Sequence, residues 1–330
     1  MNQCRSVWIG LASTAALLLS ACGGGSDSAA TGNTTAQATT STEEAPVTST
    51  TGGTATTETT ASVSTSASGE AGPRVTSFTP SGPITATAGQ VISGVRISNP
   101  GGRCITIPPG ATGVVVRDSE IGPCGGNANV LVEGANATIE HNRIVNGNRG
   151  VFVHRTGGVK VNRNYLDSFS TGVHPAGKAI ELDYLTSGEV DGNVVRGSGY
   201  GSDVVGIYES SNMRLTNNNI DVNIIEPTSA GFTMGDSTTG SPGRDNYVAF
   251  NVVRQSGGVP AGVFGSNGNT VLEKNCLSAG IQAYNYSGVF DGVTVRNNVI
   301  NMAASFVPVT SVISGWNTNV NSTNCALVPA

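Results

Sequence analysis

The sequence predicts an all-β fold in which short strands wind into a parallel β-helix of about eight to nine coils. Charged residues make up only 12% of the 330 residues and aromatic residues 5%, while glycine occurs 45 times. This composition suits short strands joined by tight turns and argues against a coiled coil or a helical bundle. In addition, one motif recurs about every 23 residues and carries an asparagine at the same position in each copy.

The repeated motif has the form apolar-x-x-Asn-x-apolar. Its seven clear copies contain Asn142, Asn164, Asn193, Asn218, Asn251, Asn275 and Asn298, at intervals of 22, 29, 25, 33, 24 and 23 residues. An eighth copy has Ser119 at the asparagine position. An interval near 23 residues corresponds to one coil of three short strands, and the longer intervals correspond to loops inserted in single coils. One coil cannot bury its apolar residues alone, whereas stacked coils form a continuous core.

This motif resembles the right-handed parallel β-helix repeat family, the architecture of pectate-lyase-like proteins. The resemblance covers about residues 80–302 and implies that the recurring asparagines form a ladder in the turn between the second and third strands. There each short amide side chain can satisfy backbone groups of the turn and its equivalents in neighbouring coils. We therefore predict a β-helix over residues 73–302 and a cap over residues 303–330 that covers the exposed sheet edges.

The first 21 residues are predicted to be a signal peptide. Arg5 precedes an apolar run from Val7 to Leu19, which is shorter than the roughly 20 residues that span a bilayer. Leu19-Ser20-Ala21-Cys22 resembles the lipobox of bacterial lipoproteins, which implies cleavage before Cys22 and attachment of lipid to it. The alternative is an ordinary secretory signal with an incidental cysteine.

Residues 22–72 are predicted to be a lipid-anchored tether, because they are rich in serine and threonine and have no apolar period. Gly23 follows the lipidated cysteine, which favours the outer membrane. We therefore expect an exported protein that is lipid-anchored in the cell envelope.

Four cysteines remain after processing: Cys104, Cys124, Cys276 and Cys325. Four cysteines allow three pairings. Cys104 and Cys124 lie almost one coil apart, so stacking would bring them together, and Cys276 with Cys325 would then join the cap to the last coils. An exported protein permits disulfides.

Outward side chains of the first strand in each coil contain the candidate catalytic groups. Strand alternation assigns Glu133, His154, Glu181 and Asp183 to the outer face of three consecutive coils. Neighbouring coils are about 4.8 Å apart, so His154 should lie between Glu133 and Asp183, and two flanking carboxylates would raise its pKa. Surface charge that serves solubility is the alternative interpretation.

We predict that Asp183 and Glu181 act as acid, base or charge neutraliser and that His154 transfers a proton. A spacing of about 7 Å along one strand suits the carboxylate pair of an inverting glycosidase. Glu133, Glu181 and Asp183 could together hold a calcium ion, since hard cations favour carboxylate oxygens, although no cofactor is required by the sequence. Glu209 occupies an inward position unless its strand ends at Ile207.

Aromatic and basic residues beside this face are the candidate substrate-binding groups. Phe152, Tyr208 and Phe264 point outward on alternate coils, with Tyr284 one coil further, a spacing similar to that of sugar rings along a glycan. Packing beneath neighbouring loops is the alternative. Lys178 and Arg155, with Arg149 and Tyr184, could neutralise a uronate or donate a proton.

These features predict a glycan-directed groove that serves a polysaccharide lyase or a glycoside hydrolase. A non-catalytic carbohydrate-binding or adhesin-like surface protein and a purely structural rod are the alternatives. Lys and Arg number 17 against 22 Asp and Glu, and without a basic face nucleic-acid binding is not expected. We expect a monomer whose partner is a polysaccharide. The sequence lacks the polygalacturonase motifs Gly-His-Gly and Arg-Ile-Lys and the pectate-lyase calcium signature, so no catalytic residue transfers from those families.

Overall fold

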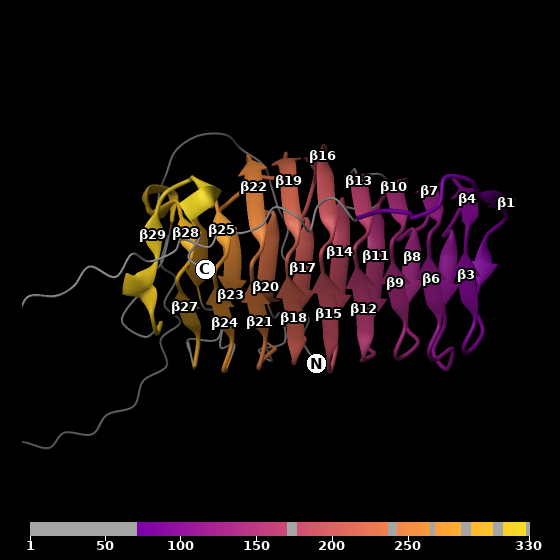
Figure 1. The fold of residues 1–330 in the computed structure, drawn as a ribbon, viewed down its shortest axis with the longest axis horizontal. Helices are drawn as coiled ribbons and strands as arrows, with labels where there is room; N and C mark the ends of the chain where they lie inside the picture. Colours follow the sequence, from indigo (N-terminus) through magenta and orange to yellow (C-terminus); the bar gives the residue numbers. More distant parts are fainter. Residues whose placement is uncertain are drawn as a thin grey trace, which may run out of the picture. The chain divides into compact units, whose positions relative to one another are not determined.

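The computed structural model describes residues 71–169, 177–236, 243–264, 268–284, 292–305 and 313–327. These residues form three parallel sheets, one of 11 strands and two of nine strands each. The chain visits the three sheets in turn, and each strand pairs in parallel with the equivalent strand of the next coil. The predicted all-β parallel β-helix is therefore confirmed. Figure 1 shows the coils stacked in sequence order, from β1 at the indigo end to β29 at the yellow end.

The three sheets are named A, B and C. Sheet A contains β1 (Thr79–Ser81), β4 (Val95–Asn99), β7 (Glu120–Cys124), β10 (Arg143–Gly147), β13 (Tyr165–Phe169), β16 (Val194–Tyr200), β19 (Asn219–Ile224), β22 (Val252–Ser256), β25 (Cys276–Leu277), β28 (Val299–Ile300) and β29 (Val320–Asn321). Sheet B contains β2 (Ile84–Thr85), β5 (Ile105–Ile107), β8 (Val130–Val132), β11 (Arg149–His154), β14 (Lys178–Asp183), β17 (Val205–Tyr208), β20 (Phe232–Asp236), β23 (Ala261–Phe264) and β26 (Ile281–Tyr284).

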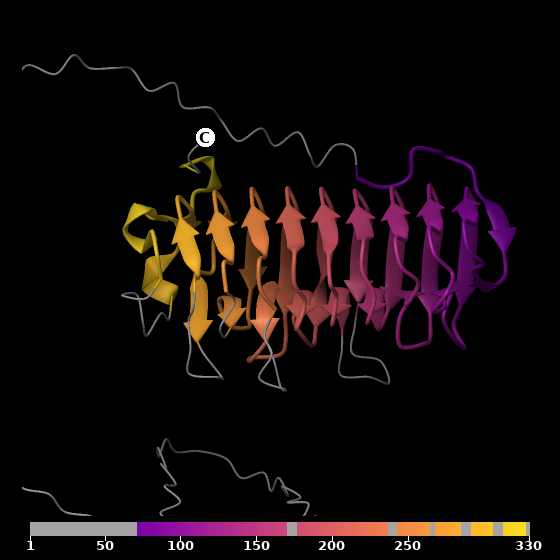
Figure 2. The ribbon, with the colours of Figure 1, turned by 90° about the horizontal axis from the view of Figure 1, so that it is seen from below.

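Sheet C contains β3 (Val91–Ser93), β6 (Val115–Arg117), β9 (Thr138–Glu140), β12 (Val159–Asn162), β15 (Gly188–Asp191), β18 (Met213–Thr216), β21 (Tyr247–Ala249), β24 (Val271–Glu273) and β27 (Thr294–Arg296). Three short 3-10 helices, η2 (Met302–Ala304), η4 (Trp316–Thr318) and η5 (Cys325–Leu327), follow the last coils. Figure 2 shows the equivalent strands of successive coils side by side along the stack. Within the described ranges, no helix is long and apolar enough to cross a membrane.

The core consists of aliphatic side chains that stack in register from coil to coil. In sheet B, Val130 pairs with Val151, Val151 with Ile180, and Ile180 with Val205, and all four are buried. Each β-branched side chain packs on the same position in the coils above and below, so the apolar rows run the length of the stack. The outward positions between these rows remain available for other chemistry.

The predicted asparagine ladder forms at the corner between sheets C and A. The side-chain nitrogen of Asn142 donates to the carbonyl of Val116 and to the Oδ1 of Asn164. The backbone nitrogen of Asn142 donates to the same Oδ1 at 3.0 Å. Equivalent bonds continue through Asn193, Asn218, Asn251, Asn275 and Asn298. These buried amides satisfy the hydrogen-bonding groups of the backbone at this corner, which is the structural role expected for them from the sequence.

A left-handed residue before each ladder position makes this corner sharp. His141 has a φ of 50°, Arg163 of 53° and Lys274 of 54°. A positive φ redirects the chain within one residue, which costs free energy for residues other than glycine. The ladder bonds and the packed coils hold these residues in place.

The stack continues beyond residue 302, the end of the β-helix expected from the sequence. β29 pairs with β28, with Val320 opposite Val299, and Asn319 accepts hydrogen bonds from Asn298 as the next member of the ladder. This copy does not match the sequence motif, because Asn321 stands where the motif has its second apolar residue. The residues that follow the regular repeats thus extend sheet A as well as covering it.

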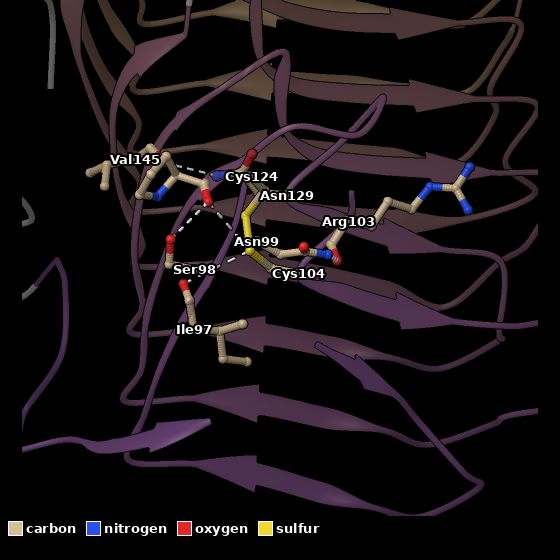
Figure 3. The surroundings of a disulfide bond; sticks show 9 residues. Ile97, Ser98, Asn99, Arg103, Cys104, Cys124, Asn129 and Val145 are labelled. Carbon is tan, nitrogen blue, oxygen red and sulfur yellow. Dashed lines mark hydrogen bonds between the residues drawn. A yellow bond between two sulfur atoms is a disulfide. The ribbon is translucent and has the colours of Figure 1, made fainter. Parts of the chain in front are cut away.

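Both cysteine pairs expected from the sequence are disulfides in the structure. Cys104 and Cys124 have Cα atoms 5.8 Å apart, and Cys276 and Cys325 have Cα atoms 5.3 Å apart. Figure 3 shows the first bridge, with the side chain of Arg103 extending away from it. This bridge joins the segment before β5 to the end of β7, and the second bridge joins η5 to β25.

Candidate functional site

The outer face of sheet B places the candidate catalytic residues on neighbouring strands. His154 in β11 is in register with Asp183 in β14, and Asp183 is in register with Tyr208 in β17. Glu133 follows Val132, which pairs with Val153, so Glu133 lies one coil before His154. The row Glu133–His154–Asp183 assigned by strand alternation therefore follows from the strand register.

Glu181 is the centre of a buried charge network. Its side chain pairs with the guanidinium of Arg149 and, at 2.8 Å, with the ammonium group of Lys178. Glu181 is 5% exposed and Lys178 is 8% exposed. A carboxylate that leaves water requires such partners. Each carboxylate oxygen of Glu181 therefore faces a cation of the protein itself, which makes Glu181 the residue that holds the network together.

The charge network continues from Lys178 to Asp203. Lys178 Nζ donates to the Tyr208 hydroxyl at 3.0 Å, and this hydroxyl donates to Asp203 Oδ2 at 2.8 Å. The backbone nitrogen of Ala230 donates to the other oxygen of Asp203 at 2.7 Å. The Tyr208 ring lies back over Gly206, where a Cβ atom would collide with it. Burial, followed by the Asp203 carboxylate, raises the pKa of Tyr208 well above its usual value.

Asp183 sits at the edge of this network, where it still reaches solvent. Its side chain is 19% exposed, and one carboxylate oxygen is 4.0 Å from Nδ1 of His154. Burial raises the pKa of Asp183 to about 7, and repulsion from Glu181 adds to the effect, while Lys178 and Arg149 oppose it. A carboxyl group with this pKa exchanges protons near neutral pH, which is the property required of a general acid or base.

His154 differs from the sequence expectation in the direction of its pKa shift. Burial, followed by the positive charge of Arg155, lowers the pKa of His154 and outweighs the carboxylates of Glu133 and Glu181. Its Nδ1 is buried without a hydrogen-bond partner among the described residues. Asp183, although only 4.0 Å away, is protonated up to about pH 7 and so supplies little negative charge below that pH. The imidazole next to Asp183 is therefore neutral near pH 7.

Aromatic rings and cations alternate beside the imidazole. The His154 ring lies 5.5 Å from Phe152 and 5.7 Å from Tyr184. Arg149 stacks over Phe152 at 4.9 Å, and Arg155 stacks over Tyr184 at 5.3 Å. Such cation–ring pairs are attractive and orient both partners. One face of each ring is therefore occupied by a cation of the protein itself.

Not every predicted residue joins this site. The ring of Tyr208 covers Gly206 and bonds to Asp203, which favours packing over sugar stacking. The side chains of Phe264 and Tyr284 lie outside the described part of the structure, although their strands β23 and β26 pair next to each other. Asp203 was missed, because it lies between strands and belongs to no repeated position.

The calcium hypothesis is not supported by the described carboxylates. Across the described ranges, no group of three or more His, Cys, Asp or Glu side chains is arranged to hold a metal ion. Glu181, one of the three proposed ligands, is paired with Arg149 and Lys178. Glu209 is half-buried and follows the end of β17 at Tyr208 with a φ of 46°, so it is not a buried core residue. Its negative charge contributes to the raised pKa of Asp183.

Comparison with known proteins supports the fold. A family model described as a right-handed beta helix region matches residues 82–181, which include Glu133, His154 and Glu181. Comparisons with curated proteins and with solved structures find no significant match. The chain therefore contains a right-handed β-helix region, a fold that hosts several functions, and its function has to be argued from the site.

Proposed function

We propose that the outer face of sheet B, from β8 to β17, binds a glycan chain and that Asp183 acts there as the general acid of a polysaccharide-cleaving enzyme. The observation that carries this proposal is the position of Asp183, whose side chain is 19% exposed on this face with a carboxylate oxygen 4.0 Å from Nδ1 of His154. The pKa of Asp183, which burial and Glu181 raise to about 7, supports the same role. Asp183 is in register with His154 and with Tyr208, so it lies in the middle of the proposed face.

The neighbours of Asp183 suit bond cleavage in a glycan. Protonated Asp183 would donate its proton to the leaving glycosidic oxygen, a step that is fastest when the acid has a pKa near the working pH. Neutral His154 could accept a proton on the same face. Glu133, two coils from Asp183 and thus about 10 Å away, would be the second carboxylate, at a separation slightly above that of inverting glycosidases. Glu181 would hold Lys178 and Arg149 in position.

We also propose that the protein acts at the cell envelope. The lipobox-like segment ending at Cys22 supports lipid attachment, and the following Gly23 supports an outer-membrane location. The tether of residues 22–72 would separate the β-helix from the membrane surface. In this setting the substrate is a polysaccharide met outside the cytoplasm, and the protein acts as a monomer.

A cleavage assay with two variants tests the proposed activity. The full chain, its Asp183→Asn variant and a control Asp221→Asn variant on sheet A are incubated with acidic and neutral polysaccharides. Reducing-end detection reports cleavage, and ultraviolet absorbance of unsaturated uronates separates elimination from hydrolysis. We expect Asp183→Asn to lower the rate by about 10²–10⁴-fold, as loss of a general acid does, and Asp221→Asn to have little effect.

Cleavage that survives in Asp183→Asn would refute the role of Asp183. If the folded wild type cleaves no glycan but retains one on an affinity gel, the chain is a carbohydrate-binding surface protein. The stacked pairs Arg149–Phe152 and Arg155–Tyr184 favour this second function, since they form a rigid, polar platform.

A further inference from the structure

A groove of about 630 Å³ lies over the first coils of sheet B, apart from the charge network. Ile84 in β2 and Thr106 in β5 line it, and the turns that lead into β5, β8 and β11 contribute Arg103, Asn127 and Asn148. Cys104, next to Arg103, is bridged to Cys124 (Figure 3). The disulfide therefore joins the turn that leads into β5 to the end of β7, beside the groove. The lining contains no acidic residue, and Arg103 is its one charged group.

Two side chains present unused hydrogen-bonding capacity to this groove. Arg103 donates from Nε to Asn127 Oδ1 at 2.6 Å, and its two terminal nitrogens have no hydrogen-bond partner in the part of the chain that the structure describes. Asn148 is 7% exposed, and its Oδ1 is buried without a partner among the same residues. Buried amides are normally paired, so this oxygen beside the groove has hydrogen-bonding capacity that the protein itself does not use.

The groove is connected to the charge network through Asn127. The carbonyl oxygen of Asn127 accepts a hydrogen bond from Arg149 at 3.3 Å, while its side chain accepts one from Arg103. Thr106 in the groove is in register with Leu131, Leu131 with Phe152, and Phe152 with Glu181. Thr106 therefore lies on the same face as Asp183 and three coils, or roughly 14 Å, before it, and the groove extends from there toward Asp183.

We infer that this groove is a remote subsite that anchors one sugar unit with a carboxylate or sulfate group, roughly three units from the bond cleaved at Asp183. The terminal nitrogens of Arg103 match the paired oxygens of such a group. Pro83, which is exposed, offers an apolar surface to the sugar ring, and the Thr106 hydroxyl can bind one of its hydroxyl groups. The Asn148 amide lies two coils further along the groove, toward Asp183. The glycan would then lie along the stack, since the rise of one coil is close to the length of one sugar unit.

This inference rests on the proposed function for the position of the cleaved bond, but not for binding in the groove. A binding measurement tests the groove separately. Full-length Asp183→Asn protein is titrated with sodium glucuronate, glucose 6-sulfate and glucose, with ligand-observed NMR as the readout. We expect both anionic sugars to bind better than glucose, and Arg103→Ala to weaken their binding about tenfold or more. A control Arg254→Ala, on the exposed face of sheet A, should leave binding unchanged.

Equal binding of glucose and glucuronate, or binding unaffected by Arg103→Ala, would overturn the anionic subsite. Asn148→Asp provides a second variant, because a negative charge in the groove should repel the anionic sugars while changing one atom of the side chain. If Asn148→Asp binds the anionic sugars as tightly as the wild-type protein does, the subsite is also refuted.

Product analysis tests the spacing. On a glycan that the wild type cleaves, Arg103→Ala should lose the preference for products of about three to four units, while Arg254→Ala should keep it. An unchanged product distribution would refute the spacing. Binding of glucuronate through Arg103 without cleavage of any glycan would instead refute the proposed enzyme and leave the groove as a carbohydrate-binding site.

Discussion

The asparagine ladder and the charge network on sheet B are both buried and polar, but they are built in opposite ways. In the ladder, one amide in each coil repeats the same bonds, as in the pair Asn164–Asn193. In the network, Glu181 pairs with Arg149 and Lys178, and within the described ranges no other coil has this arrangement of charges. Repetition satisfies the hydrogen-bonding needs of the backbone, so a buried charge network that does not repeat, and that is costly to desolvate, is the better candidate for function.

The largest expected effect compares two glutamates that each pair with two cations. Glu181→Gln leaves the buried Lys178 and the half-buried Arg149 beside a neutral group and should lower the free energy of unfolding by about 3–5 kcal/mol. Glu120→Gln breaks pairs with the exposed Arg96 and Arg143 and should cost less than about 1 kcal/mol. Urea denaturation of both variants measures the difference. Equal costs would mean that the sheet B network is an ordinary surface ion pair.

The second effect is a pH dependence that originates at Asp183. Its folded-state pKa of about 7 lies above the ordinary 3.8, so between these values the folded protein holds a proton that the unfolded chain releases. Stability should therefore fall as pH rises from about 4 to about 7, by up to about 4 kcal/mol, and level off above. Asp183→Asn should remove this slope, and Asp221→Asn should retain it. Thermal denaturation at several pH values measures this slope. A slope that persists in Asp183→Asn would contradict the assignment to Asp183.

The third effect tests the ladder. Asn193→Ala removes the acceptor of the Asn164 nitrogens and the donor to the Val161 carbonyl, all in a buried corner. We expect a loss of about 3 kcal/mol, because unsatisfied buried groups cost about 1–3 kcal/mol each. The amide does not titrate, so the loss should be the same at pH 5 and pH 8. Asn223→Ala, at an exposed position of β19, serves as the control, and a similar loss there would remove the distinction.

The smallest effect concerns the segment that precedes β1. Arg74 bonds to Asp118 at 2.7 Å, and the nitrogen of Gly72 donates to Arg163. Because Arg74 is half exposed, Arg74→Ala should cost less than about 1 kcal/mol. The hydrogen bond from Arg74 lowers the pKa of Asp118, so this contribution is present above about pH 4 and is lost as pH falls through the lowered pKa. Faster hydrogen exchange at Gly72 in the variant would be the direct readout, and unchanged exchange would show that the contact does not hold the segment.

Much of the fold could be predicted because its signal is periodic. The asparagines from Asn142 to Asn298 were identified from the repeated motif and its spacing, and the resemblance to the β-helix repeat family implied that they form a ladder. Strand alternation placed Glu133, His154 and Asp183 on one face. The copy at Asn319 was missed, since Asn321 breaks the apolar pattern. The pKa of His154 was predicted in the wrong direction, because spacing gives distances between charges but not their burial.

The sequence by itself determined the coil, its register and the outward positions, because a short repeat forces every strand into the same environment. Only the tertiary structure decided the chemistry of that face. Whether Glu181 stands open on that face or is paired with Arg149 and Lys178, and whether Asp183 keeps its proton near pH 7, depends on side chains from separate coils and on how much water they exclude. Burial and charge–charge interactions of this kind arise from packing in three dimensions, so they produce no periodic pattern in the sequence.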